Sequence, residues 1–338
     1  MSPLQSLVRT VQQSKGVAHK QDIAIGMDEL AKAEPCQATC EVGDDCAAIK
    51  SRDGSYTLLA IEGFMNEFVQ DDPWFAGYCG VMVNVSDIAA MGGRPTAVVD
   101  AVWTADSQQL KLILQGMSVA SRRYQVPIVG GHTNARNSHA QLAVSILGHA
   151  DVLLSSFKAE PDDVLMAVID LRGNYRGAGN NWNTSTEAPA ERLRADLDLM
   201  PWVAQQGIAQ ACKDISMAGP LGTALMMLEC SGCGGELWPD AFPRPTGVAL
   251  ERWMQTFPSF GFIFSVKPAN VDSMKRLFAQ QELPCAEVGR VATGTEVWVS
   301  QANQRELLWD FSARPLLACQ QVNKLPEQKG DVYASGSI

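Results

Sequence analysis

Short apolar runs, each bounded by Asp, Gly or Ser, recur along the chain and alternate with longer amphipathic stretches. Apolar runs of this length are typical of buried strands, whereas apolar positions spaced three and four apart favour helices. The pattern predicts strands at residues 46–50, 56–64, 95–103, 126–130, 140–150, 164–170, 260–266 and 296–300. It predicts helices over most of residues 1–35, 73–92, 106–124, 189–212 and 220–230.

A polar segment near residues 155–162, which contains a proline, separates the two halves of the chain. A chain of 338 residues suits two domains of about 150 residues each. We therefore expect domains at residues 1–158 and 159–325, followed by a flexible tail at 326–338. A Gly/Asn-rich stretch at 173–186 predicts a long loop, and such loops are usually lids, binding loops or disordered segments.

The charge of the chain limits its partners. The net charge is −10 and the isoelectric point is near 4.9, which argues against nucleic acid or an anionic membrane as the main partner. No apolar run reaches the roughly 18 residues of a membrane span, and the first residues lack the apolar core of a secretory signal. Nine cysteines, an odd number spread over a long chain, are typical of reduced thiols. These features predict a cytoplasmic protein.

Two cysteine pairs are candidates for a metal or redox site. Cys230 and Cys233 form the motif CSGC, and Cys36 and Cys40 form a looser pair. A structural zinc site needs a second ligand pair at matching spacing, and the sequence offers none. The alternative is that CSGC consists of small residues that end a helix.

Asp87 stands alone in the apolar segment VNVSDIAAMGGRP. If this segment is helical, the residues three and four positions away carry no positive charge; they are Val83, Asn84, Ala90 and Met91. A buried carboxylate is unfavourable unless a cation or several hydrogen-bond donors reach it. The sequence therefore predicts that a cation from elsewhere meets Asp87, with Asn84 on the same face of the helix.

Four other carboxylates stand where predicted strands or helices begin or end. Asp44 and Asp45 precede a strand, Glu62 ends one, and Asp214 precedes a glycine-bearing turn into a helix. Taken singly, each can be a turn residue, a helix N-cap or a solvated strand end. Together, in an acidic chain without a basic patch, they fit a hard cation. Mg²⁺ takes one or two carboxylates and leaves its other positions to water and phosphate.

The segment VGGHTNARN supplies groups suited to an anion. Gly130 and Gly131 leave backbone N–H groups open to close approach. Thr133 adds a hydroxyl donor, and His132 is either neutral structure or the donor of a charge-assisted hydrogen bond to phosphate. The P-loop and dinucleotide-binding glycine patterns are absent from the sequence. A phosphate-binding turn of another kind is the interpretation that follows.

These motifs resemble those of a known superfamily. GDDCAAI, VNVSDIAAMGGRP, GGHT and DISMAGPLGTAL occur in the order and spacing of the AIR synthase (PurM-like) superfamily, over roughly residues 40–235. That group includes aminoimidazole ribonucleotide synthase, thiamine-monophosphate kinase, selenophosphate synthetase and the hydrogenase-maturation carbamoyl dehydratase. The resemblance implies an α+β, two-domain PurM-like fold with a C-terminal α/β domain. It also implies a homodimer in which the N-terminal sheets pair, with Mg²⁺ and ATP in the cleft.

The resemblance implies roles for individual residues as well. The candidate metal ligands are Asp44, Asp45, Glu62, Asp87 and Asp214, where Glu62 replaces the aspartate usual in the kinase and selenophosphate branches. The candidate ATP- and phosphate-binding residues are Lys20, Asn84, Gly130, Gly131 and Thr133. The candidate catalytic residue is His132.

Three departures separate the chain from the named branches. His132 is aspartate in the kinase's GGDT motif but histidine in the selenophosphate branch. Met217 replaces the second aspartate of the kinase's DISDG motif. The N-terminal region lacks the reactive CGCK motif of the selenophosphate branch and offers only Lys20. We therefore expect an AIR synthase-related protein outside the named branches.

The predicted function is that of a Mg²⁺-dependent enzyme that uses ATP to phosphorylate or activate a small acceptor. Phosphoryl transfer depends mainly on positioning and on metal charge. Thiamine-monophosphate kinase-like or selenophosphate synthetase-like activity is an alternative. A second alternative is a nucleotide-binding paralogue without activity, which Glu62 and Met217 favour. A third is a cysteine-based metal or redox protein.

Overall fold

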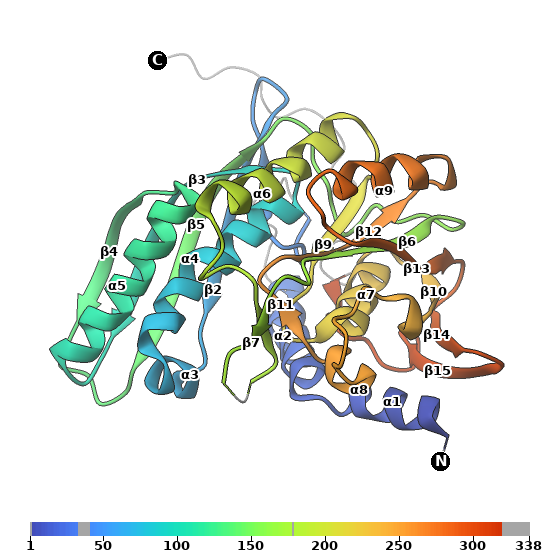
Figure 1. Cartoon of the computed structure of the whole chain (residues 1–338), viewed down its shortest axis with the longest axis horizontal. Helices are drawn as coiled ribbons and strands as arrows, with labels where there is room; N and C mark the ends of the chain where they lie inside the picture. Colours follow the sequence, from blue (N-terminus) through green and yellow to red (C-terminus); the bar gives the residue numbers. More distant parts are fainter. Residues whose placement is uncertain (1, 33–40, 178, 320–338) are drawn as a thin grey trace.

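The computed structural model describes residues 2–32, 41–177 and 179–319 (Figure 1). The predicted tail at 326–338 and the Cys36/Cys40 pair lie outside the described residues. The helices are α1 Pro3–Gln12, α2 Lys15–Lys32, α3 Asn66–Asp71, α4 Pro73–Ala90, α5 Ser107–Tyr124, α6 Ala190–Gln205, α7 Gly219–Cys230, α8 Leu250–Trp253 and α9 Val271–Ala279. Short 3₁₀ turns lie at Pro239–Ala241 and Pro268–Asn270.

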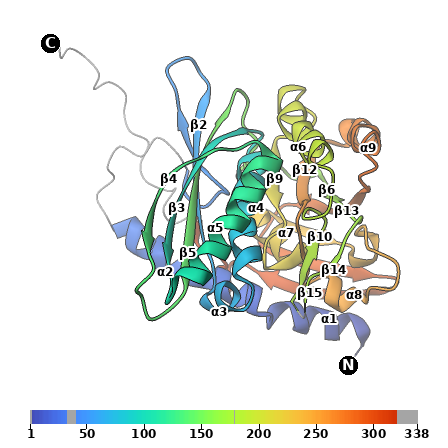
Figure 2. The same ribbon diagram turned by 60° about the vertical axis from the view of Figure 1, so that its left-hand side comes forward.

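The first half of the chain forms a five-stranded sheet in the order β1-β2-β5-β3-β4. Its strands are β1 Ala47–Lys50, β2 Tyr56–Gly63, β3 Arg94–Trp103, β4 Ile128–Asn134 and β5 Gln141–Ala150. Neighbouring strands are antiparallel, except that β3 and β4 are parallel. Helices α4 and α5 cover one face of this sheet (Figure 2). The other face carries exposed apolar side chains, among them Leu59, Ile61 and Leu147.

Helix α4 is buried on almost every side. It contacts the sheet through β2 and β5, and α5 crosses it closely. Glycines make the crossing possible, because a Cβ atom on Gly77 would lie 2.0 Å from the Ile113 carbonyl oxygen. A Cβ atom on Gly116 of α5 would lie 1.9 Å from the Trp74 carbonyl oxygen. A helix packed on all sides is apolar all round, so a carboxylate near its end is buried as well.

The second half forms a seven-stranded sheet in the order β15-β14-β10-β13-β6-β12-β9. Its strands are β6 Val164–Ile169, β9 Ala211–Asp214, β10 Gly234–Leu237, β12 Gly261–Val266, β13 Cys285–Ala292, β14 Glu296–Gln301 and β15 Gln304–Asp310. Every residue of β6 is buried, because alternate residues pack in two separate cores. One core includes α1 and α7, and the other includes α6 and α9. A strand covered on both faces reads as a continuous apolar run.

Most of the predicted helical range 189–212 is helical, but the helix ends before the range does. Helix α6 ends at Gln205, and Gly207 follows with a φ of +63°. Residues with positive φ are typical of helix C-termini, where glycine adopts this conformation without strain. The chain then forms β9, which pairs with β12 and contacts α4. The last residue of β9 is therefore placed against the N-terminal half.

The predicted long loop at 173–186 carries two short strands. It contains β7 Asn174–Tyr175 and β8 Asn181–Asn183, which form a three-stranded sheet with β11 Phe257–Pro258. Strands of two or three residues are too short to produce a periodic pattern. Arg176 pairs with Asp72 at 2.8 Å, and the Tyr175 hydroxyl lies 2.7 Å from the Thr256 hydroxyl. These contacts anchor the first part of the segment on both sides.

Candidate metal and phosphate site

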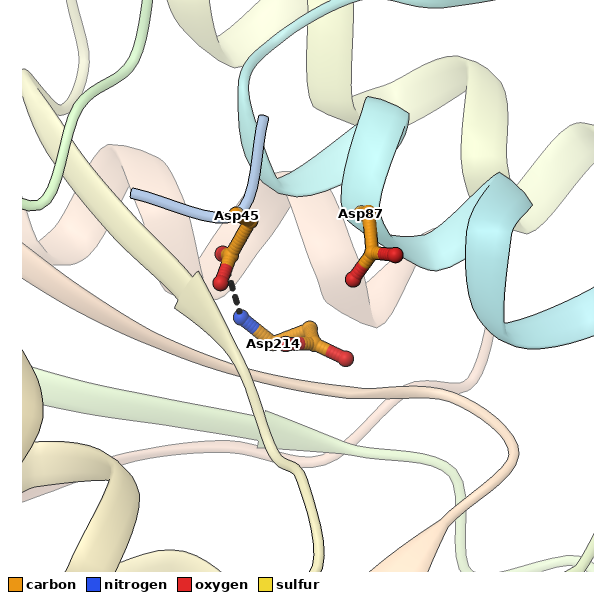
Figure 3. A group of neighbouring side chains, drawn as sticks. All are labelled: Asp45, Asp87 and Asp214. Atoms are coloured by element: carbon orange, nitrogen blue, oxygen red, sulfur yellow. Dashed lines mark hydrogen bonds between the residues drawn. The ribbon is translucent and has the colours of Figure 1, made fainter. Parts of the chain in front are cut away.

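Three aspartates from distant parts of the chain meet where α4 passes the end of β9. Asp45 lies just before β1, Asp87 lies in the last turn of α4, and Asp214 ends β9. One carboxylate oxygen from each lies within 4.8 Å of the other two (Figure 3). Over residues 2–32, 41–177 and 179–319, this is the one group of three or more His, Cys, Asp or Glu side chains close enough to share an ion.

Asp87 occupies the most demanding position of the three. It is 6% exposed, and its Oδ2 atom has no hydrogen-bond partner among the described residues. Burial, followed by the negative charges of Asp214, Glu62 and Asp45, raises the pKa of Asp87 well above its usual range. A buried carboxylate without donors needs a cation or a proton to neutralise it. The Asp87 carboxylate lies opposite Asp45 and Asp214, where a shared cation would reach it (Figure 3).

Asp45 already has two donors. The Lys213 ammonium forms an ion pair with its Oδ1 atom, and the Asp214 main-chain N–H donates to its Oδ2 atom at 3.3 Å. Lys213 is 5% exposed, and the charges of Asp45 and Asp44 raise its pKa against the opposing effect of burial. Sequence reasoning missed Lys213. The available signal was a charged residue inside β9, directly before Asp214.

Asp214 and Glu62 are also shifted towards the neutral form. Burial, and then the charge of Asp45, raises the pKa of Asp214 to about 8. Burial is also the main reason that the pKa of Glu62, at the end of β2, is raised. The positive charge of Lys20 opposes both shifts, so the Lys20 ammonium on α2 lies near both carboxyl groups. The charges of Glu62 and Lys20 thus act on the aspartate group.

Asp44 is not part of the group of three aspartates. Its Oδ2 atom accepts hydrogen bonds from the Ser155 hydroxyl at 2.7 Å and from the Ser156 N–H at 3.0 Å. Its Oδ1 atom accepts from the Ser156 hydroxyl at 2.6 Å. Asp44 therefore fastens the turn that carries Asp45 to the segment after β5. Its role as a metal ligand stays a prediction from the resemblance.

The predicted phosphate turn lies in a strand. Gly130, Gly131, His132 and Thr133 belong to β4, the exposed edge of the five-stranded sheet. A Cβ atom on Gly131 would lie 2.0 Å from Oδ1 of Asp100, so this glycine makes room for a neighbouring carboxylate. Three strand spacings, about 14 Å, separate β4 from the strand that carries Glu62.

Among the described residues, no hydrogen bond or ion pair joins the His132 or Asn84 side chain to the three aspartates. The His132 ring packs against Trp103 with ring centroids 5.6 Å apart. The Asn84 side chain is fully buried, and its Nδ2 atom donates to the Gly80 carbonyl oxygen at 2.8 Å. Their catalytic and phosphate-binding roles stay predictions, as do those of the β4 glycines and Thr133.

The CSGC motif does not assemble a metal site within the described residues. Sγ of Cys230 lies 3.1 Å from Sγ of Cys319, and the Cys233 thiol points to the Ala159 carbonyl oxygen at 3.6 Å. The contact with Cys319, followed by burial, raises the pKa of the Cys230 thiol. Protonated buried thiols are inert and bind metals poorly, which favours the structural explanation of this motif.

The donor set of the aspartate group fits Mg²⁺. All of its ligands are carboxylate oxygens, which hard cations prefer. The unpartnered Oδ2 atom of Asp87 is the position that a bound cation would satisfy. In the described part of the chain, no helix is both long and apolar enough to cross a membrane.

Two family models match the chain. One is described as the N-terminal domain of AIR synthase related protein and matches residues 43–150. The other is described as the C-terminal domain of the same protein and matches residues 164–300. The first match contains Asp45 and Asp87, and the second contains Asp214.

Two relatives match over almost their whole length. An uncharacterized protein from Synechocystis sp. is 42% identical over 320 residues, which are 93% of this chain and 98% of the relative. An uncharacterized protein from Methanocaldococcus jannaschii is 30% identical over 322 residues, 94% of this chain and 99% of the relative. Phosphoribosylformylglycinamidine synthase subunit PurL from Pyrococcus furiosus is 24% identical over 277 residues, 74% of this chain and 39% of PurL.

Solved structures share the fold. T. maritima PurL complexed with FGAR superposes with a TM-score of 0.69 at 16% identity, over 100% of this chain and 56% of the PurL chain. AaThiL complexed with AMPPCP and TMP superposes with a TM-score of 0.62 at 18% identity, over 82% of this chain and 93% of that chain. The predicted α+β fold with N- and C-terminal domains is confirmed.

Proposed function

Because the chain belongs to the AIR synthase-related family, we propose that it is a Mg²⁺-dependent enzyme that uses ATP to phosphorylate or activate a small acceptor. The observation that carries the proposal is the buried Asp87 carboxylate, whose unpartnered oxygen belongs to a group of three aspartates. A cation is the simplest group that satisfies all three at once.

In this proposal, Asp45, Asp87 and Asp214 hold Mg²⁺. The bound ion supplies positive charge that orients the phosphates of ATP and offsets the charge that develops during transfer. Lys20 offsets the charge of Glu62 and Asp214 before nucleotide binds, and we propose that its ammonium binds a phosphate oxygen of ATP. Asp44 holds the turn that carries Asp45 in place.

Structural relatives support the use of ATP. T. maritima PurL complexed with ATP superposes with a TM-score of 0.67, and the AaThiL structure contains AMPPCP. Sequence identity to both is below 20%, so the acceptors of those proteins are not transferred to this chain. Met217, which is 39% exposed, stands three positions after Asp214, where the kinase motif has a second aspartate. We infer an acceptor that is small and is not itself a phosphate ester.

We also propose a homodimer, built on the open face of the five-stranded sheet. This face carries apolar side chains that are each at least 42% exposed, namely Ile49, Leu59, Ile61, Val99 and Leu147. An apolar face of this kind is typical of an interaction surface. A second copy is the occupant that the family resemblance favours, since a two-fold interface uses the same surface on both subunits.

His132 belongs to the same open face. It pairs in register with Ala101 of β3, which faces the same way as Val99, two positions earlier. In the proposed dimer, His132 and the β4 glycines therefore lie at the interface rather than beside the aspartates of their own subunit.

The test is to incubate the purified protein with Mg-ATP and pools of small hydroxyl, amine and carboxylate acceptors, and to measure ADP. The proposal expects ADP formation that depends on one acceptor class and that disappears in an Asp87→Asn variant. Mg-ATP binding without ADP formation across all pools favours the second candidate, a nucleotide-binding paralogue without activity. Glu62 and Met217 are the residues that support that candidate.

A further inference from the structure

Lys213 is a buried ammonium inside a cluster of carboxyl groups. Its side chain is 6% exposed, and so is that of its ion-pair partner Asp45. The charge of Lys213 also acts on Asp44, Asp87 and Asp214. Burying an ammonium is costly unless charge and hydrogen bonds compensate it. Lys213 is a residue of β9, and its positive charge compensates part of the negative charge of the aspartate group.

The hydrogen bonds of Asp45 limit what this residue can do for metal ions. Each carboxylate oxygen offers about two lone pairs. The Lys213 ammonium uses one on Oδ1, and the Asp214 N–H uses one on Oδ2. One lone pair therefore remains on each oxygen, but a divalent ion at Oδ1 would lie beside the Lys213 ammonium, which repels it.

The carboxyl groups of Asp44 and Glu62 also interact with other groups of the protein. Both oxygens of Asp44 accept hydrogen bonds from Ser155 and Ser156. The positive charge of Lys20 acts on Glu62 more strongly than that of Lys213. The positive charges of Lys213 and Lys20 therefore both act on this cluster, and each repels a second divalent cation.

We propose that the Lys213 ammonium takes the place of a second cation, so that Asp45, Asp87 and Asp214 bind a single divalent ion in the protein without nucleotide. The inference rests on the metal site of the proposed function and specifies its ion count. Lys213 acts as a positioning residue, because it acts through its ion pair with Asp45.

The test is equilibrium dialysis against MnCl₂ without nucleotide, since Mn²⁺ accepts the same oxygen ligands as Mg²⁺. We expect one Mn²⁺ per wild-type chain and a second bound ion in Lys213→Met, which keeps the length of the side chain and removes its charge. Lys275→Met is the matched control, because Lys275 pairs with Glu287 at 2.8 Å on the surface. This control is expected to bind one ion. If Lys213 had only a structural role, its replacement would not change the number of bound Mn²⁺ ions.

Thermal unfolding gives a second readout. Without metal, Lys213→Met is expected to unfold at a lower temperature than the wild type, and MgCl₂ is expected to raise that temperature at least twice as far as in the wild type. If Lys213→Met fails to fold, the double variant Asp45→Asn/Lys213→Met removes both charges of the pair. We expect this double variant to fold without metal.

The outcomes separate the two proposals. Two Mn²⁺ per wild-type chain, or an unchanged count in Lys213→Met, overturns the role of Lys213 and leaves the proposed function standing. No Mn²⁺ bound to the wild type overturns the metal site itself, and with it both proposals. A double variant that fails to fold shows that Lys213 supports the strand for reasons other than charge, and it also overturns the inference.

Discussion

The main-chain N–H of Asp214 donates a hydrogen bond to Oδ2 of Asp45 at 3.3 Å, although 169 positions separate the two residues (Figure 3). Asp45 precedes the first strand of the N-terminal sheet, and Asp214 ends an edge strand of the C-terminal sheet. The bond therefore joins the two halves of the chain at the candidate site. Asp87 of α4 completes the group, so the site exists only when both halves are folded against each other.

Replacing Asp87 by asparagine removes a buried charge at nearly constant shape. We expect Asp87→Asn to weaken Mg²⁺-dependent nucleotide binding more than about tenfold, or ~1.4 kcal/mol. The unfolding temperature without metal should stay the same or rise, because the variant no longer buries a carboxylate without donors. Calorimetric titration and thermal unfolding measure the two effects.

Asp163→Asn is the matched control for this variant. Asp163 is 3% exposed and accepts a hydrogen bond from Ser265 at 2.7 Å. It precedes Val164, whose partner on β12 is Val266, whereas Asp214 pairs with Phe262 at the other end of β12. Its replacement should destabilise the fold and leave nucleotide affinity unchanged. Equal losses of affinity in both variants would mean that Asp87 acts only through stability.

The proposed dimer predicts that a charge on the open sheet face separates the subunits. Leu59 of β2 and Leu147 of β5 are direct cross-strand partners, each more than 40% exposed. Leu59→Lys should give a monomer of 36.5 kDa in light scattering at micromolar concentration, where the wild type has twice this mass. Leu114→Lys, on α5, is the control and should remain a dimer. A monomeric wild type would contradict the proposal.

Much of the fold could be predicted from the sequence, because most strands are apolar runs and α4, α5 and α7 have clear end signals. The strand β13 was missed because polar side chains interrupt its apolar pattern. Glu287 on this strand pairs with Lys275 of α9 at 2.8 Å. The strand β10 was missed because two of its four residues are glycines. In both strands, tertiary packing outweighs local pattern.

The site could be predicted in part. An isolated acid in an apolar helix identifies Asp87, since nothing nearby neutralises it. The sequence could not tell whether Asp44 or Asp45 faces the other aspartates, because Ser155 and Ser156, more than 100 positions away, decide this. Lys213 was missed because its burial follows from the packing of β9 rather than from the residues around it.

The stability of the protein should depend on the protonation of Asp196 in α6. This carboxyl group is 2% exposed, and burial raises its pKa from 3.8 to about 6, although Arg172 opposes the shift. Between about pH 4 and pH 6, Asp196 is protonated in a larger fraction of native molecules than of unfolded molecules. The contribution of Asp196 to the free energy of unfolding therefore falls as the pH rises through this window, by up to about 3 kcal/mol.

Urea unfolding from pH 4 to pH 7 measures this effect as the difference between the wild type and Asp196→Asn. The free energy of unfolding of the wild type minus that of Asp196→Asn should fall as the pH rises to about 6, and should then stay constant. Asp198→Asn serves as the control, because Asp198 lies on the same helix and is 59% exposed. A difference that stays constant across the whole range would show that Asp196 titrates as it does in the unfolded chain.

Because Met217 replaces an aspartate of the kinase motif, we expect no useful thiamine-monophosphate kinase activity. The kinase motif has a second aspartate where this chain has Met217, so one charge that would help to hold a metal beside a phosphorylated acceptor is missing. Methionine offers a flexible apolar contact instead. A coupled assay for thiamine diphosphate with Mg-ATP and thiamine monophosphate tests this expectation. Turnover near about 1 s⁻¹ would refute it.

The central claim is that a divalent ion held by Asp45, Asp87 and Asp214 carries the nucleotide. The most direct measurement is the calorimetric titration of the wild-type protein with ATP, first in MgCl₂ and then in EDTA. The account predicts saturable binding in MgCl₂ and a loss of affinity of at least about tenfold, ~1.4 kcal/mol, in EDTA. Equal ATP affinity in the two buffers would contradict it.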